Sequence, residues 1–169
     1  MEKISKEYID EMLSMIQEKA PLIHCITNEI TVNDVANIIL AVGGSPTMAH
    51  HEKEVEEITS QSDCLLINLG ATEYLNQIYI SGSVKNVTKI FDPVGSAASI
   101  FRREEALKII KEIKPNVIRG NYSEIFALYF NKKMARGVDR EENNEIMNAV
   151  EVVSDFAVKT GSIVIASGA

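Results

Sequence analysis

The sequence is poor in the residues that mark small secreted domains. Its 169 residues include no tryptophan and only two cysteines, and aromatic side chains make up 6% of the chain. Small secreted domains are usually dense in disulfides, so this composition argues against that class. Because Cys25 and Cys64 both lie in apolar runs, we interpret them as buried thiols in a reducing compartment rather than as a disulfide.

Positive charge is also scarce. The chain has 17 Lys and Arg residues against 24 Asp and Glu residues, which gives a formal net charge of −7. A nucleic-acid surface needs basic patches, so this balance argues against nucleic acid as a partner. One group of basic residues alternates with glutamates and therefore predicts a solvated helix face: Arg102, Arg103, Lys108 and Lys111.

Long apolar runs and the common nucleotide-binding motifs are both missing. No run approaches the roughly 20 residues that cross a bilayer, and the first residues lack the basic region and apolar core of a signal peptide. We therefore expect a cytoplasmic protein without a membrane partner. The sequence contains neither Gly-x-x-x-x-Gly-Lys-[Ser/Thr] nor Gly-x-Gly-x-x-Gly. Their absence argues against a P-loop enzyme and weakens a dehydrogenase-like interpretation.

The chain does contain a regular alternation of apolar and amphipathic segments. Continuous apolar runs predict buried strands, and apolar residues at helical spacing predict helices. Strands are expected at 22–26, 64–69, 88–91, 116–118 and 162–166, with a turn or short strand at 45–48. Helices are expected between the cap Ser5 and Pro21 and over 31–42, 52–60, 72–79, 103–113, 121–130 and 141–159, with a loop at 131–140. The pattern predicts one α/β domain over residues 1–169 with a mainly parallel sheet. An incomplete (β/α) barrel has the same alternation and is the alternative.

The motif Phe91-Asp92-Pro93-Val94-Gly95 ends one predicted strand. A residue before proline prefers an extended backbone, so Asp92 should finish its strand with its side chain at the edge of the sheet. Ligands of open α/β sheets bind at the carboxyl ends of the strands, and a carboxylate there suits Mg²⁺. The alternative role for Asp92 is to cap the following turn.

The motif Arg119-Gly120-Asn121-Tyr122-Ser123-Glu124 ends the next predicted strand. Asn121 and Glu124 have the spacing of a helix capping box, and that structural role alone would explain both residues. Arg119 is left unexplained, and guanidinium groups match phosphate oxygens well. A carboxylate beside a phosphate needs a cation between them. Arg119 together with Glu124 therefore favours a site for a metal and a nucleotide.

Two further candidate residues follow the first predicted strand and the Gly43-Gly44 turn. Asn28 and Met48 offer an amide and a soft apolar side chain, which suit a small, flat, mostly apolar substrate; ordinary core packing is the alternative for Met48. His24 lies in an apolar run and is expected in the core. The pair His50-His51 lacks a third ligand at suitable spacing, so we predict no zinc site.

Taken together, these motifs resemble the hydroxyethylthiazole kinase family, which acts in thiamine salvage and has the ribokinase-like fold. The matching segments, in the family's order and rough spacing, are 21–28, 36–37, 43–49, 67–70, 91–95, 101–102, 119–125 and 137–139. The resemblance extends from about residue 20 to the end of the chain. It implies a three-layer αβα fold with a mainly parallel central sheet, which would be incomplete at the carboxyl end.

The resemblance also implies a reaction and its participants. The family transfers the γ-phosphoryl group of ATP to the hydroxyl of 4-methyl-5-(2-hydroxyethyl)thiazole, with Mg²⁺, and its members form homotrimers. By similarity, three residues would line the thiazole pocket: Asn28, Met48 and Gly70. Four would bind ATP: Arg119, Asn121, Ser167 and Gly168. Two carboxylates would bind the metal: Asp92 and Glu124.

The position of the catalytic group leads to two hypotheses. In the family, a glycine-rich anion hole and the Cys or Asp that deprotonates the substrate hydroxyl come later in the chain, so we expect them beyond Ala169. Phosphoryl transfer depends on positioning and charge stabilisation, so the 169-residue chain alone should turn over little substrate. The second hypothesis is a non-catalytic, degenerate paralogue that binds thiazole or nucleotide.

Overall fold

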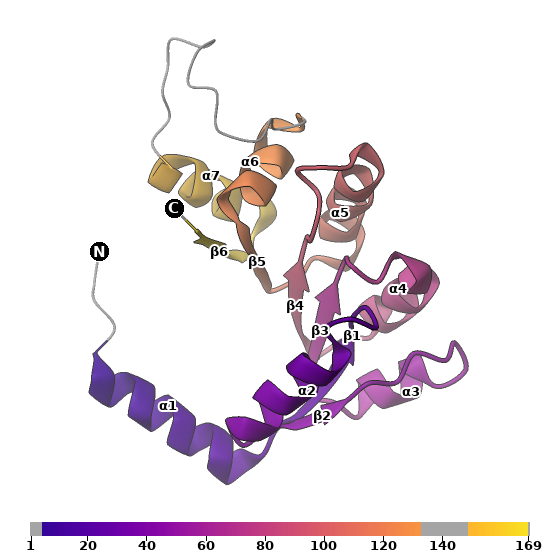
Figure 1. The fold of residues 1–169 in the computed structure, drawn as a ribbon, viewed down its shortest axis with the longest axis vertical. Coiled ribbons are helices and arrows are strands. Elements are labelled where there is room, and N and C mark those ends of the chain that lie inside the picture. Colours follow the sequence, from indigo (N-terminus) through magenta and orange to yellow (C-terminus); the bar gives the residue numbers. More distant parts are fainter. Residues whose placement is uncertain (1–4, 133–148, 169) are drawn as a thin grey trace.

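A computed structural model of the chain describes residues 5–132 and 149–168. Helices and strands alternate along the described residues (Figure 1). The strands are β1 (Leu22–Ile26), β2 (Ser45–Thr47), β3 (Cys64–Asn68), β4 (Thr88–Asp92), β5 (Val117–Asn121) and β6 (Ile163–Ser167). The helices are α1 (Lys6–Lys19), α2 (Val32–Ala41), α3 (Val55–Ser60), α4 (Leu75–Ser83), α5 (Ile100–Ile113), α6 (Tyr122–Phe130) and α7 (Ala149–Thr160), with a 3₁₀ turn, η1, at Thr72–Tyr74.

The strands form one sheet in the order β2-β1-β3-β4-β5-β6, and all five neighbouring pairs are parallel. The predicted α/β class with a parallel sheet is therefore confirmed. The barrel alternative is wrong, because a barrel pairs each strand with the one before it, whereas here β1 lies between β2 and β3. This reversal of direction is a topological switch point, the place where open α/β sheets bind ligands.

The reversal also divides the helices between the two faces of the sheet. Right-handed crossovers place the helix that joins β1 to β2 on one face and the helices of the later crossovers on the other. Figure 1 shows α2 on one side and α3 to α7 on the opposite side. Helix α1 extends away from the sheet, and none of its residues is buried.

The main core lies between the sheet and helices α4 to α7. Alternate strand residues point into it, and Leu65, Ile67, Phe91 and Ile118 have no exposed surface. Each such side chain contributes about 1.5–3 kcal/mol of burial free energy. The pairing register places Leu66, Ile90, Val117 and Ile163 in one row on the opposite face, and the last of these is 66% exposed. The helices packed on the core face thus hold the strands in place from one side of the sheet.

Several expectations about single elements need correction. The helix at 52–60, which its charged residues predict to be exposed, begins only at Val55; Glu56 and Glu57 are exposed, but Val55 and Thr59 are fully buried, so one side of the helix packs inside the protein. The helix predicted from about 72 to 79, with an extension past Gly82 left open, starts as the 3₁₀ turn, and α4 then runs through Gly82 to Ser83. The strand predicted at 116–118 extends to Asn121, which is also the N-cap of α6.

Two predicted surfaces also differ from the structure. Arg103 belongs to the basic cluster expected on a solvated helix face, but it is 7% exposed, and nothing in the described residues pairs with its Nε or Nη1. Both cysteines are free thiols; Cys25 is buried as predicted, whereas Cys64 is only half-buried. The predicted loop 131–140 and the start of the predicted helix 141–159 lie mostly outside the described residues. Within those residues, no helix has the length and apolar character that a membrane span requires.

Candidate functional site

Two hollows lie along the carboxyl edge of the sheet, and the first of them lies next to the switch point. The first has a cavity volume of about 150 Å³ and is formed by the segments that follow β1 and β2, together with η1. The second has a volume of about 280 Å³ and is formed by the segments that follow β4, β5 and β6. Of the sequence-predicted site residues, Met48 lines the first hollow, and Asn121, Glu124, Ser167 and Gly168 line the second. Four others line neither of these two hollows: Asn28, Gly70, Asp92 and Arg119.

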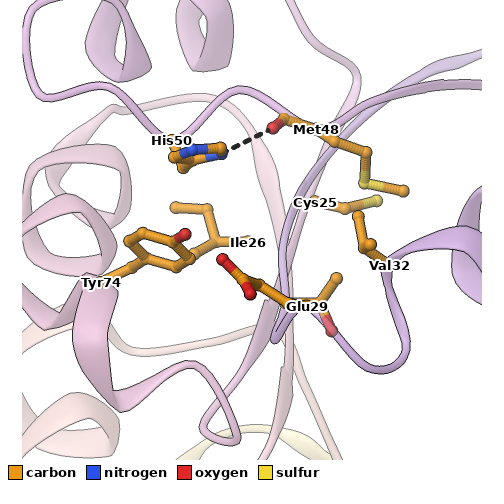
Figure 2. Close-up of a pocket in the computed structure, with 8 residues that line it drawn as sticks. Cys25, Ile26, Glu29, Val32, Met48, His50 and Tyr74 are labelled. Atoms are coloured by element: carbon orange, nitrogen blue, oxygen red, sulfur yellow. Dashed lines mark hydrogen bonds between the residues drawn. The ribbon is translucent and has the colours of Figure 1, made fainter.

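The first hollow is mostly apolar. Its lining residues come from β1, the start of α2, the loop after β2 and η1: Cys25, Ile26, Thr27, Glu29, Val32, Met48, His50 and Tyr74. Figure 2 shows the rings of His50 and Tyr74 on one side and Met48, Cys25 and Val32 on the other. A cavity of about 150 Å³ with apolar walls is large enough for one six-membered ring. This hollow therefore suits a single small ring rather than a nucleotide.

Asn28 lies between the lining residues Thr27 and Glu29 in the sequence and is close to Gly70, but neither Asn28 nor Gly70 lines this hollow. The Oδ1 of Asn28 accepts hydrogen bonds from the backbone N–H groups of Ile30 (3.0 Å) and Thr31 (3.1 Å), so the side chain fixes the turn into α2. A Cβ atom at Gly70 would lie 2.5 Å from Asn28 Nδ2 and 2.6 Å from Asn68 Oδ1. A Cβ at position 70 would force the ends of these two amide side chains to move, so glycine fits this position best.

Met48 and Cys25 give the first hollow its apolar wall. Met48 is half-buried and lines the cavity directly, so it does more than fill the core. Cys25 is 2% exposed, and burial raises the pKa of its thiol to about 12. Cys25 is therefore neutral near pH 7 and acts as a small apolar wall residue, not as a nucleophile.

His24 holds the loop that carries Met48. It is fully buried, as predicted. Its Nε2 lies 2.8 Å from the carbonyl oxygen of Ala49, and its Nδ1 lies 2.7 Å from Thr59 Oγ1. Burial lowers the pKa of His24, although the Ala49 carbonyl and the charge of Glu54 oppose this effect. The neutral imidazole thus ties the wall of the first hollow to α3.

The second hollow is built around the amino end of α6. Its lining residues include the small residues of the β4–α5 loop and the first turn of α6: Gly95, Ala97, Ala98, Asn121, Tyr122, Ser123, Glu124, Ser167 and Gly168. The predicted capping box is present, because Asn121 Oδ1 accepts from the Glu124 N–H and Glu124 Oε2 accepts from the Asn121 N–H, both at 2.9 Å. Helix amino ends favour anions, so this hollow suits a phosphate chain.

Glu124 also connects the two walls of this hollow. It is 9% exposed, and its Oε1 accepts a hydrogen bond of 2.9 Å from the backbone N–H of Gly95. One carboxylate therefore fixes both the start of α6 and the loop that follows β4. Gly95 has a φ of +80°, and a Cβ there would lie 2.9 Å from Cδ of Arg102, so glycine is needed at this turn.

Asp92 and Arg119 form an ion pair beside the second hollow, with 3.4 Å between Oδ2 and Nη1. The Arg119 side chain is 52% exposed, whereas that of Asp92 is 19% exposed. Burial, and then the nearby charge of Glu124, raise the pKa of Asp92 to about 6 despite the arginine. The turn-capping alternative for Asp92 finds no support in the hydrogen bonds of the described residues, because its Oδ1 is buried without a partner.

The residues around Asp92 fit a magnesium ion that is shared with phosphates. The described residues hold no group of three His, Cys, Asp or Glu side chains that could bind a metal alone. Magnesium, however, often uses one or two carboxylates with water and substrate phosphates. The unpartnered Oδ1 of Asp92 is a suitable oxygen ligand, while both oxygens of Glu124 already accept backbone hydrogen bonds.

The two hollows are neighbours along the edge. Asn68 pairs in register with Asp92, and the backbone N–H of Leu69 donates to the Asp92 carbonyl oxygen at 3.0 Å. Asp92 therefore lies beside the end of β3, which leads to Gly70, and its own strand leads to Gly95 in the second hollow. At the far end, Ser167 Oγ lies 3.4 Å from the Gly120 carbonyl oxygen, and Gly168 has a φ of +99°.

Of the residues that line the first hollow, only Met48 was predicted from the sequence as a site residue, and three of the others come from the surrounding turns: Glu29, His50 and Tyr74. Glu29 follows Asn28 in a turn, His50 had been considered only as a zinc ligand, and Tyr74 fell inside a predicted helix. Spacing gives no signal for them, because the three come from separate connections that only the sheet topology brings together. The switch-point rule, applied to a known strand order, would have pointed to the first two.

Comparison with known proteins identifies the family. The sequence profile of the hydroxyethylthiazole kinase family matches residues 13–169. Hydroxyethylthiazole kinase of Clostridium botulinum (strain Alaska E43 / Type E3) is 42% identical over 168 residues, which cover 95% of this chain and 60% of the relative. The hydroxyethylthiazole kinase of Clostridium acetobutylicum is 42% identical over 171 residues, covering 95% of this chain and 63% of the relative.

A solved structure agrees with the sequence comparison. Hydroxyethylthiazole kinase from Pyrococcus horikoshii OT3 superposes with a TM-score of 0.81 at 31% identity, over 96% of this chain and 61% of that protein. The chain thus spans about three-fifths of the length of these relatives. The profile match over almost the whole chain and the shared fold lead to one conclusion: this chain belongs to the hydroxyethylthiazole kinase family.

Proposed function

We propose that this chain supplies the substrate pocket and part of the ATP site of a hydroxyethylthiazole kinase, which transfers the γ-phosphoryl group of ATP to the hydroxyl of 4-methyl-5-(2-hydroxyethyl)thiazole. One observation carries the proposal: a small, mostly apolar hollow and a hollow at the amino end of α6 both lie along the carboxyl edge of the sheet, and the carboxylate of Asp92 ends β4, between β3 and β5. A phosphoryl transfer needs this arrangement, because the acceptor hydroxyl must reach the end of the phosphate chain.

In the first hollow, the thiazole ring would lie against Met48 and the apolar wall. Asn28 and Gly70 would form the border past which the hydroxyethyl group extends. Because Gly70 precedes Asp92 along the edge, the hydroxyl end of the substrate would point toward the second hollow. This orientation leaves the ring buried and only the reacting group near the phosphates.

In the second hollow, the phosphate chain of ATP would approach the amino end of α6, beside Asn121. Arg119 would contact phosphate oxygens, and Ser167 and Gly168 would contact the nucleotide from the β6 side. Asp92 would hold Mg²⁺, which when bound neutralises charge on the phosphates. Glu124 would act mainly by holding Gly95 and Asn121 in place and by adding negative charge near the ion.

The test uses the purified 169-residue chain with Mg²⁺. Calorimetry would measure the binding of hydroxyethylthiazole and of a non-hydrolysable ATP analogue, and mass spectrometry would measure ATP-dependent phosphorylation. We expect both ligands to bind, each independently of the other, and little product, since the family's catalytic Cys or Asp is expected beyond Ala169. A folded chain that binds neither ligand would contradict the proposal.

A chimeric protein tests the degenerate-paralogue hypothesis. Joining the chain to the carboxyl-terminal part of the Clostridium acetobutylicum relative should restore phosphorylation if the proposed roles are correct. A chimera that folds and binds both ligands but yields no product would favour a binding protein without catalytic function. Product from the 169-residue chain alone would instead place the catalytic groups within it.

We also infer self-association, and a homotrimer is the expected form. Helices α1 and α2 expose large apolar side chains that a monomer would leave in water. These are Tyr8, Ile9, Leu13 and Met15 in α1 and Ile38 and Leu40 in α2; Ile30, in the turn before α2, is 89% exposed. Light scattering after gel filtration would give the mass directly. A monomer at micromolar concentration would contradict this inference without affecting the two ligand sites.

A further inference from the structure

The outer wall of the first hollow consists of two aromatic rings. The same rings face a third, larger hollow, which we call the outer hollow. The imidazole of His50 and the phenol ring of Tyr74 have centroids 4.8 Å apart and an interplanar angle of 31°. Both residues line the 150 Å³ cavity and also the outer hollow, which has a volume of about 430 Å³. The other residues of the outer hollow are polar or charged: His51, Glu52, Lys53 and Gln77. The two rings therefore lie between a small hollow and a larger one.

Separate contacts hold the two rings in place. His50 Nδ1 lies 3.2 Å from the carbonyl oxygen of Met48, so its ring is tied to the loop that carries another cavity residue (Figure 2). Tyr74 is half-buried and packs against the main core. Across the outer hollow, Asn76 Nδ2 donates to Glu52 Oε1 at 2.7 Å, which joins α4 to the loop after His50. The wall is thus supported from both the sheet and the helix layer.

We propose that His50 and Tyr74 determine substrate size by limiting the first hollow to one flat ring, and that removal of either ring opens it to fused bicyclic alcohols. The inference rests on the proposed thiazole site and adds its specificity-determining residues. The apolar side of the cavity cannot perform this role, because Cys25 and Ile26 belong to a buried strand inside the sheet. On the His50–Tyr74 side, the outer hollow provides empty space behind the two rings.

The chemistry of the wall also favours a flat ring. An aromatic ligand can stack against or meet the edge of these rings, which contributes about 0.5–1.5 kcal/mol beyond area burial. That energy corresponds to a factor of about 2 to 12 in affinity. A saturated ring of the same size would lose this contribution, so the wall should select aromatic alcohols as well as small ones.

The test compares two probes by calorimetry: hydroxyethylthiazole and its benzo-fused analogue, a hydroxyethyl-benzothiazole. For Tyr74→Ala and His50→Ala we expect thiazole binding to weaken about 2- to 12-fold and binding of the bicyclic probe to strengthen. Tyr74→Phe keeps the ring and should behave as the unmodified chain. Gln77→Ala changes only the outer hollow and is the matched control, with no expected change for either probe.

Folding and function can be separated in this design. His50 is exposed, so His50→Ala should keep the thermal midpoint even if Tyr74→Ala lowers it. One result would overturn this inference and leave the proposed function standing: the unmodified chain binds the thiazole, and a folded His50→Ala chain keeps the same ratio of affinities for the two probes. Failure of the unmodified chain to bind the thiazole alcohol would overturn both.

Discussion

The two hollows at the sheet edge differ in the way they are built. The first is enclosed by apolar side chains and a neutral buried imidazole, and its shape is set by steric contact. The second is open and is shaped by charge. The charge of Glu124, together with burial, raises the pKa of Asp92. We therefore expect substrate recognition and phosphate recognition to be separable, so that a single substitution affects one and spares the other.

The largest expected effect comes from filling the space at Gly70. Gly70→Val should weaken hydroxyethylthiazole binding on the order of 100-fold, because its side chain would meet Asn28 Nδ2 and Asn68 Oδ1 at distances under 3 Å. Binding of the ATP analogue should change less than threefold (roughly the 0.5 kcal/mol expected for independent sites). Calorimetry with both ligands measures the two effects in one sample. An equal loss for both ligands would show that the hollows are not separable.

The reverse experiment removes the charge between the hollows. Asp92→Asn should weaken binding of the Mg²⁺–ATP analogue about 10- to 100-fold and leave thiazole binding intact. The same change should stabilise the ligand-free chain at pH 8 by about 1–3 kcal/mol, since burial and Glu124 raise the pKa of Asp92 to about 6. Urea unfolding at pH 8 measures the gain. Asp10→Asn, at an exposed position of α1, is the control.

A smaller effect is expected for the carboxylate that fixes the walls of the second hollow. Glu124→Gln keeps the size of the side chain but leaves one of two backbone N–H groups, at Gly95 or Asn121, facing an amide donor. Loss of one such bond at a buried position should cost about 1–3 kcal/mol in urea unfolding. Glu104→Gln makes the same chemical change on an exposed face of α5 and should cost less than about 0.5 kcal/mol. Similar costs for the two would contradict the wall role.

Much of the second hollow could be predicted from the sequence, and less of the first. The motifs around Asp92 and Asn121 each follow an apolar strand, and parallel pairing necessarily brings such strand ends to one edge. The capping box was visible as a local spacing, and local hydrogen bonds are what spacing encodes. The part these residues play in ligand binding stays a prediction.

The unpredicted features depend on contacts between distant segments. Tyr74 lines the first hollow only because η1 packs beside the loop that carries His50, twenty-four positions earlier in the chain. Arg103 has the charge pattern of a solvated helix face, yet tertiary packing covers it. Helix α3 is rich in glutamate, yet Val55 and Thr59 are fully buried, and Thr59 Oγ1 lies 2.7 Å from His24 Nδ1. Composition and periodicity carry no information about any of these contacts.

The smallest predicted effect is an opposite response of the two hollows to acid. His24 has a lowered pKa in the folded chain, so its contribution to stability is present above the unfolded value of 6.5 and is lost as the pH falls below it. Asp92 has a raised pKa, so its contribution is complete below the unfolded value of 3.8 and is lost as the pH rises through about 6. Between pH 7 and 5, acid should therefore loosen the Met48–Ala49 wall and relieve the repulsion at Asp92, each by at most about 1.4 kcal/mol per pH unit. Urea unfolding of Asp92→Asn across this range should show the His24 loss alone, with a steeper fall in stability than in the unmodified chain. Equal slopes for the two chains would mean that Asp92 titrates near its ordinary value and that the charge between the hollows is weaker than its burial implies.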